Sequence, residues 1–312
     1  MTLQAEITEA LARGLSFVLA AQNAAGAWTD WALPPGPSSS WTTAYVGLKL
    51  SCLGQRDRVA LAEPLDRAAC WLLSQQPESG GWGYNQEVEP DADSTAQALL
   101  FLAATGRAAP RSACAFLARY QQPDGGFATF LPDALTGSWG LSHPEITPVA
   151  LLALRASPGG LPEDGLARGL AWLRRARRSD GIWNSFWWST PLPATEACLG
   201  LFAALGSPEP CPSALATWHP ADSLETALLL SIAATAGPSP RLEQLARRLL
   251  AHQADDGSWH SLPALRITAR DCERPWEATM PGPLFADPQR LHSTATALAA
   301  LSKAQQVQTS SI

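Results

Sequence analysis

Apolar residues recur at helical spacing along most of the chain, in two alternating patterns. Segments of the first pattern carry apolar residues on one face and Arg, Glu or Gln on the other, as in LARGLSFVLAAQ (11–22) and LARGLAWLRRAR (166–177). Segments of the second pattern are rich in Ala and Leu and are apolar nearly all round. A one-sided pattern is typical of a helix at the protein surface, whereas an all-round pattern predicts a helix that is buried on every side.

A repeated turn follows each one-sided segment. Gly ends a helix and reverses the chain, and here an aromatic residue comes one or two positions after it. The copies are AAQNAAGAW (20–28), SQQPESGGW (74–82), YQQPDGGF (120–127), ARRSDGIW (176–183) and HQADDGSW (252–259). A sixth copy, PSALATWHPAD (212–222), has lost its Gly. The chain therefore consists of six repeats.

The all-round apolar segments begin near Ser40, Asp93, Glu145, Ala194, Asp222 and His292. Outer and inner helices in alternation predict an all-α fold, a closed α6/α6 barrel (an α/α toroid) of six helix pairs. We expect one barrel domain over residues 1–306 and a flexible tail over 307–312. Because the two kinds of helix alternate, all inner helices run in one direction. Their N-termini should meet at one mouth, beneath the long loops 128–144 and 260–290.

Composition narrows the classes of partner and compartment. A net charge of −6 without a basic stripe argues against nucleic acid as a partner. No apolar run reaches the length of a membrane span, and the N-terminus lacks the pattern of a signal peptide. The six cysteines are scattered without a CxxC pair, which is typical of free thiols in a reducing cytoplasm. The sequence leaves the oligomeric state open.

Two acidic residues stand where the second inner segment begins, in GGWGYNQEVEPDADSTAQAL (80–99). Asp is a favoured N-cap residue, so Asp91 or Asp93 would be explained by capping alone. Both residues also belong to the predicted mouth of the barrel. A carboxylic acid in a dry apolar site keeps its proton at neutral pH and can donate it. Capping and acid chemistry are both open interpretations of this pair.

The turns on paired helices resemble the QW repeats of squalene-hopene cyclases and their relatives. GGWGYN followed by PDADSTA (90–96) resembles the segment of these enzymes that carries a D-x-D-D-T-A motif, and DGIWNSFWWST (180–190) is similar to a later family turn. The resemblance implies a class II terpene cyclase in a single-barrel form, which starts cyclisation by protonating an alkene or epoxide. It implies that Asp93 is the general acid and that Asp91 supports it.

The sequence departs from the family pattern at two places. Ser94 replaces the third Asp of the motif, and we expect Ser94 and Thr95 to orient the acid through hydrogen bonds. Many relatives carry an acid followed four residues later by a His that bonds the catalytic Asp. Glu145 matches that acid and is expected to be a supporting carboxyl group, but Val149 occupies the His position, with His143 nearby.

The chain has 13 Trp against 3 Tyr, and a carbocation is stabilised by aromatic faces, of which Trp is the best. Trp28, Trp82, Trp183 and Trp259 belong to the repeat turns, where stacking on outer helices is expected. Aromatic residues on mouth loops or at inner helix starts are expected to bind substrate, with ordinary packing as the alternative. They are Trp41, Tyr84, Phe130, Trp139, Phe186, Trp187, Trp188, Trp276 and His292.

The substrate expected from the resemblance is a linear isoprenoid, either a C15 or C20 prenyl diphosphate or a prenylated small molecule. Proton-initiated cyclisation requires no obligatory cofactor, whereas a diphosphate would bring Mg²⁺ with it. Four arginines of the last long loop are either solvated or hold such a diphosphate; they are Arg266, Arg270, Arg274 and Arg290.

Two rival functions use the same barrel. Protein prenyltransferases bind zinc through Asp, Cys and His, and this chain offers Asp271, Cys272 and His292. In that family, however, the Asp and Cys open an inner helix rather than follow one another in a loop, and we expect no metal site. The second rival is an isoprenoid-binding barrel whose acid motif has lost its activity.

Overall fold

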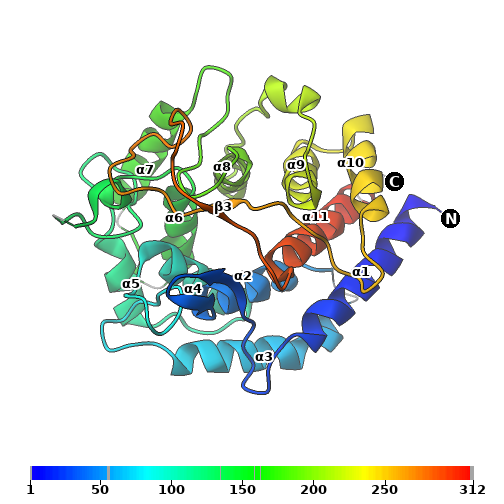
Figure 1. The fold of residues 1–312 in the computed structure, drawn as a ribbon, viewed down its shortest axis with the longest axis horizontal. Coiled ribbons are helices and arrows are strands. Elements are labelled where there is room, and N and C mark those ends of the chain that lie inside the picture. The colour runs from blue at the N-terminus through cyan, green and yellow to red at the C-terminus, as the bar shows by residue number, and fades with distance from the viewer. Residues whose placement is uncertain (1, 55–56, 134, 158, 162, 310–312) are drawn as a thin grey trace.

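The computed structural model describes residues 2–54, 57–133, 135–157, 159–161 and 163–309. Six helices form an inner ring: α2 (Ser40–Ser51), α4 (Ala92–Ala104), α6 (Ile146–Ala156), α8 (Leu192–Ala204), α9 (Ser223–Ala236) and α11 (Leu291–Thr309). Each contacts the next in this order, and α11 contacts α2 (Figure 1). The ring is therefore closed, and each inner helix begins within two residues of its predicted start.

The outer helices are α1 (Leu3–Ala20), α3 (Arg58–Ser74), α5 (Arg111–Ala118), α7 (Glu163–Ala176) and α10 (Pro240–Ala251). They surround the ring, with α1 against α11, α3 against α2 and α10 against α9. The worn repeat supplies only a short 3₁₀ helix, η2 (Ser213–Thr217), in the remaining outer position. Three prolines in 207–212 explain this, because proline has no backbone N–H to continue a helix. The predicted α/α barrel is confirmed.

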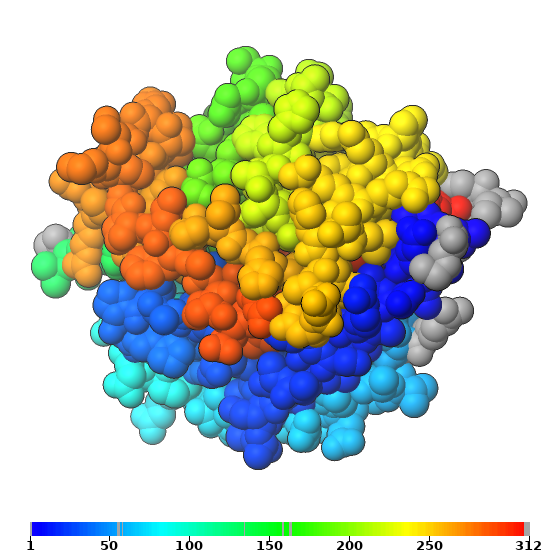
Figure 2. All heavy atoms as spheres, turned by 45° about the vertical axis from the view of Figure 1, so that its right-hand side comes forward, coloured from blue at the N-terminus to red at the C-terminus, as the bar shows by residue number. Residues whose placement is uncertain are grey.

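The loops at the mouth contain the strands of the described chain. β1 (Asp30–Leu33) pairs with β2 (Gly36–Ser38), and β3 (Leu265–Arg266) pairs with β4 (Leu284–Phe285), both antiparallel. A second short 3₁₀ helix, η1 (Gly137–Gly140), lies in the other long loop. Figure 2 shows the segment around β3 and β4, in orange, lying across one face between N-terminal residues in blue and later repeats in green and yellow. At the C-terminus α11 continues to Thr309, three residues into the predicted tail.

The repeat turns share one set of hydrogen bonds to the outer helices. The turn glycines have positive φ angles, for example 101° at Gly125. A Cβ on Gly125 would meet the carbonyl oxygen of Arg168 in α7 at 2.5 Å, so this position requires Gly. Gln121 donates from Nε2 to the carbonyl oxygens of Gly125 and Gly165, at 3.0 and 2.7 Å. The turn is thus fixed to the next outer helix.

The aromatic residue of each turn joins the outer helix to the inner helix. The indole N–H of Trp82 donates to the carbonyl oxygen of Leu72 in α3 at 2.8 Å. Its backbone N–H donates to Oγ1 of Thr95 in α4 at 3.0 Å. The same backbone bond to a threonine recurs in four other repeats, through Thr43, Thr147, Thr195 and Thr294. The predicted stapling role of the turn tryptophans fits this geometry.

Candidate active site

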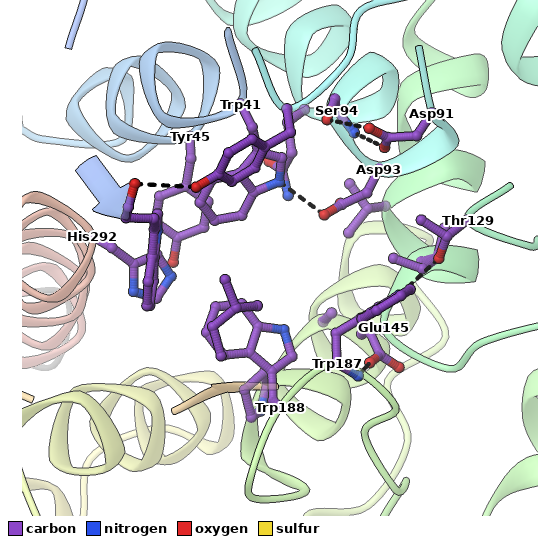
Figure 3. A pocket seen from close by; sticks show the side chains of 18 of the residues that line it. Trp41, Tyr45, Asp91, Asp93, Ser94, Thr129, Glu145, Trp187, Trp188 and His292 are labelled. Carbon is purple, nitrogen blue, oxygen red and sulfur yellow. Dashed lines mark hydrogen bonds between the residues drawn. The ribbon is translucent and has the colours of Figure 1, made fainter. Parts of the chain in front are cut away.

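A cavity of about 610 Å³ lies inside the ring of inner helices, below the mouth loops. Side chains from α2, α4, α6, α8 and α9, together with His292 of α11 and the mouth loops, line it (Figure 3). Most of the lining is apolar or aromatic. An apolar cavity of this size with a few convergent polar groups is typical of a small-molecule site.

Asp93 is the second residue of α4 and points into this cavity. Its Oδ2 accepts a hydrogen bond from Nε1 of Trp41, at 2.8 Å. Burial raises the pKa of Asp93 to about 6, against the lowering effect of hydrogen bonds from Trp41 and Gln97. A substantial fraction of the Asp93 carboxyl group is therefore protonated in mildly acidic solution, and the indole is placed to stabilise the carboxylate after proton loss.

Asp91 is the N-cap of α4. Its Oδ1 accepts from the backbone N–H of Ser94 at 2.8 Å, and its Oδ2 accepts from the Ser94 hydroxyl at 2.7 Å. Burial, and then the charge of Asp93, raise the pKa of Asp91 to about 7. Asp91 therefore has the capping role. Asp93 does not cap the helix, and its side chain faces the cavity, where it is available for acid chemistry.

The hydroxyl groups of Ser94 and Thr95 do not orient Asp93, contrary to expectation. Ser94 donates to Asp91. Thr95 accepts from the backbone N–H of Trp82 and donates to its carbonyl oxygen at 3.2 Å. Thr95 accepts the same hydrogen bond from a turn aromatic that threonines accept in the other repeats. Its side chain therefore faces the outer layer rather than the cavity.

Glu145, which precedes α6, lies on the cavity wall and holds the neighbouring turn. Its Oε1 accepts from the backbone N–H groups of Phe186 and Trp187, at 2.6 and 2.7 Å. Its Oε2 has no hydrogen-bond partner among the described residues. Burial raises the pKa of Glu145 to about 7 against these hydrogen bonds. Glu145 thus supports the cavity wall that carries Trp187.

His143 does not bond the acid. Its Nδ1 lies 3.0 Å from Oγ1 of Thr129 and its Nε2 lies 3.0 Å from the carbonyl oxygen of Ser138. Its ring stacks on Phe186 with a centroid distance of 3.9 Å. Burial lowers the pKa of His143 to about 3, so the ring is neutral. Val149, at the family's His position, lines the cavity as an apolar residue.

Seven of the nine residues expected to bind substrate line the cavity: Trp41, Tyr84, Phe130, Trp139, Trp187, Trp188 and His292. Phe186 and Trp276 do not line it. Phe186 is buried beneath the wall against His143. Trp276 is 41% exposed, and its indole N–H donates to Glu277. The sequence placed both in the correct loops but did not show which way their side chains turn.

An aromatic box surrounds His292 at the start of α11. Its ring lies 4.5 Å from the ring centroid of Tyr45, 5.1 Å from that of Trp188 and 5.3 Å from that of Trp31. Burial, and then the charge of Lys49, lower the pKa of His292 to about 3. The imidazole is therefore neutral and adds no charge to the cavity.

Several lining residues were missed by the sequence reasoning, namely Trp31, Tyr45, Lys49, Gln97 and Glu196. Helical spacing contains a signal for two of them. Trp41, Tyr45 and Lys49 are four residues apart in α2, so they lie on one face of it. Glu196 lies on α8 and also lines the cavity.

Among the described residues, neither a zinc site nor a converging group of loop arginines is formed. No group of three or more His, Cys, Asp or Glu side chains among the described residues could hold a metal ion, and this includes Asp271 and Cys272. The four arginines of the last loop point to different partners. Arg266 donates to the carbonyl oxygen of Phe186, Arg270 to that of Leu135, Arg274 pairs with Glu277, and Arg290 with Asp256.

None of the helices among the described residues is long and apolar enough to span a bilayer.

Comparison with known proteins shows which proteins this chain is similar to. No family model matches the chain. Human lanosterol synthase (Homo sapiens) is 40% identical over 86 residues, a match that spans 27% of this chain and 11% of the synthase. The chain thus corresponds to a small part of that enzyme.

Solved structures match over nearly the whole chain. The type II terpene cyclase MstE from Scytonema superposes with a TM-score of 0.84 at 24% identity, covering 98% of this chain and 100% of that one. A variant of MstE in complex with geranylgeranyl dihydroxybenzoate, its substrate, gives 0.82 at 25%, covering 98% and 99%. A protein from Actinoplanes gives 0.84 at 28%, covering 96% and 99%. The chain has the fold of type II terpene cyclases in a single-barrel form, as the QW-repeat resemblance implied.

Thr95 can be tested against the matching threonine of another repeat. We expect Thr95→Val and Thr195→Val each to lower the free energy of unfolding by about 1 to 3 kcal/mol, because each leaves a buried backbone N–H without its acceptor. Denaturant unfolding of both variants measures this. A much larger cost at Thr95 than at Thr195 would contradict a shared structural role.

Proposed function

We propose that this protein is a protonation-initiated terpene cyclase that acts on a linear isoprenoid joined to a small molecule. The observation that carries the proposal is the Asp93 carboxyl group, which faces an apolar aromatic cavity, has a raised pKa and accepts a hydrogen bond from Trp41. The full-length structural match to MstE supports it.

The reaction is an isomerisation without a net change in atoms. Asp93 transfers its proton to a terminal alkene carbon, the π electrons form the new C–H bond, and a tertiary carbocation remains. Internal alkenes attack this cation to form C–C bonds and rings, and a base removes a proton from the last cation. The Asp93 carboxylate then regains a proton from solvent. The Trp41 N–H stabilises the carboxylate that forms as the proton leaves, so this hydrogen bond strengthens along the reaction.

The cavity suits the cations that follow. The faces of Trp31, Trp41 and Trp188 are available for cation–π attraction. His292 is neutral in their midst and does not repel a cation. The apolar walls exclude most water, which would otherwise trap the cation before ring closure.

The class of substrate follows from two observations. Variants of MstE have been solved in complex with a prenylated aromatic acid, geranylgeranyl dihydroxybenzoate, and another variant in complex with the product, merosterolic acid A. Among the described residues, the arginines of the last loop do not converge on one anion. Both support a prenylated small molecule over a prenyl diphosphate, and hence a reaction that uses no Mg²⁺.

The decisive assay incubates the protein with farnesyl and geranylgeranyl dihydroxybenzoate and analyses extracts for cyclised isomers of unchanged mass. Asp93→Asn should lower turnover by at least ~100-fold, because the amide cannot donate the proton. The exposed Asp133→Asn variant is the matched control and should retain activity. Cyclisation that persists in Asp93→Asn would refute the acid, and binding without turnover by the unmodified protein would favour the non-catalytic barrel.

The hydrogen bond from Trp41 gives a pH prediction. Turnover requires protonated Asp93, so it should fall as pH rises through about 6. The Trp41 N–H stabilises the charged form of Asp93. Trp41→Phe should therefore raise the pKa of Asp93 and move the fall in turnover to higher pH. Trp139→Phe is the control, because Trp139 lines the cavity while its indole N–H donates to Thr268. If the pH at which turnover falls moves equally in both variants, or in neither, the role of Trp41 is contradicted.

A further inference from the structure

Lysine is rare in this chain, and the lysines that it has lie on neighbouring inner helices. The sequence has two lysines, Lys49 and Lys303, against 20 arginines. Both lysines lie on inner helices, Lys49 on α2 and Lys303 on α11, which contact each other in the ring. Both lysines are half-buried on inner helices, and Lys49 is the one that lines the cavity.

Lys49 lines the deep end of the cavity. It is eight residues beyond Trp41 in α2, which places it about 12 Å further along the helix axis at a rise of about 1.5 Å per residue. Its Nζ lies 5.2 Å from the ring centroid of Tyr45. No carboxylate oxygen of the described residues lies within 4.0 Å of this ammonium group.

Glu196 lies near the two lysines and is already engaged. Its Oε1 accepts from the hydroxyl of Ser231 at 2.7 Å. Burial raises the pKa of Glu196, but the charges of Lys49 and Lys303 outweigh this, so the net shift is downward and the group is ionised. Lys303 donates to Oγ1 of Thr235 at 2.7 Å and to the carbonyl oxygen of Ser231 at 3.0 Å.

The deep end therefore carries two positive charges and one negative charge. A buried charge without a partner is costly, and proteins normally pair it or bind a counter-ion there. Among the described lining residues, Lys49 is the permanently charged cation, and the carboxyl groups of Asp91, Asp93 and Glu145 lie at the other end. One unbalanced positive charge is thus open to a ligand, at the end of the cavity opposite the acid.

We infer that Lys49 binds a singly charged anionic head group, a carboxylate, on the substrate of this cyclase. The prenyl chain then extends from Lys49 towards Asp93 through a cavity whose apolar lining includes Leu100, Val149 and Leu152. The inference rests on the proposed function and adds the head group and its orientation. A diphosphate, with two or more negative charges, exceeds the single charge that the site leaves unbalanced.

This orientation agrees with the chemistry of the cation. An ammonium group repels a carbocation, so the first cation is stabilised best beside Trp41, which donates to Asp93 and begins about 12 Å from Lys49 along the axis of α2. Anchoring the head group at the opposite end places the terminal alkene at Asp93. The positive charge thus serves both to bind one end of the substrate and to set the direction in which it lies.

The test compares geranylgeranyl dihydroxybenzoate with its methyl ester, which has the same shape and no charge. Binding to Asp93→Asn protein is measured by calorimetry, so that turnover does not interfere, and KM is measured with active protein. The acid should bind at least ~10-fold more tightly than the ester. Lys49→Met should bring this ratio close to one, Lys49→Arg should retain most of it, and Arg270→Met should leave it unchanged.

The outcomes separate the inference from the function on which it rests. Cyclisation of both probes, with a ratio that Lys49→Met does not change, overturns the head-group site while the cyclase stands. Acid-selective binding that depends on Lys49, without cyclisation, supports the site and overturns the cyclase. Farnesyl diphosphate with Mg²⁺ is the third probe, and tighter binding than the acid overturns a singly charged head group. If Lys49→Met does not fold, Lys49→Gln provides the same comparison.

Discussion

The hydrogen bond between the backbone N–H of a turn aromatic and an inner-helix threonine is the interaction on which this barrel depends. It fixes the height of each inner helix relative to its outer partner, and it recurs around the ring. In the second repeat the acceptor is Thr95, two residues after Asp93. The bond that builds the ring therefore also fixes the start of α4, from which the proposed acid enters the cavity.

The cavity is organised by charge along its length. Carboxyl groups with raised pKa values lie at the end near the mouth, where Asp91 and Glu145 flank the proposed acid. Lys49 and Glu196 line the deep end, and the charge of Lys303 acts on Glu196 there. Between them the walls are apolar and aromatic. A neutral acid and a distant fixed charge are compatible in one small cavity because they occupy opposite ends of it.

Much of the fold could be predicted from the sequence, because the pattern of outer helix, turn and inner helix occurs six times along the chain. The Gly and aromatic pattern located the turns, and the change from one-sided to all-round apolar segments located the inner helices. The acid pair could also be placed, since Asp91 and Asp93 stand at a helix start. The role of Thr95 could not be assigned, because a small rotation around a helix turns a side chain from the cavity to the outer layer, and Ser94 lines the cavity but bonds Asp91 rather than Asp93.

The remaining site residues depend on loop paths and on helix rotation. Phe186 and Trp276 lie in the expected loops but turn away from the cavity. Lys49 and Glu196 lie within apolar helices, where a charged residue signals an interior polar site only once the helix is known to face a cavity. Sequence periodicity identifies the layer to which a helix belongs, whereas tertiary packing decides which of its residues meet the substrate.

The central claim is that burial in the cavity raises the pKa of Asp93 to about 6, so that a substantial fraction of this carboxyl group holds a proton in mildly acidic solution. Infrared difference spectra between the unmodified protein and Asp93→Asn, recorded from about pH 3 to about pH 8, report the protonated carboxyl group of Asp93, together with the change that loss of its charge causes at Asp91. The account predicts a carbonyl band that disappears with a midpoint near pH 6. A carboxylate band that is already complete by about pH 5, as for an Asp with an ordinary pKa near 3.9, would contradict it.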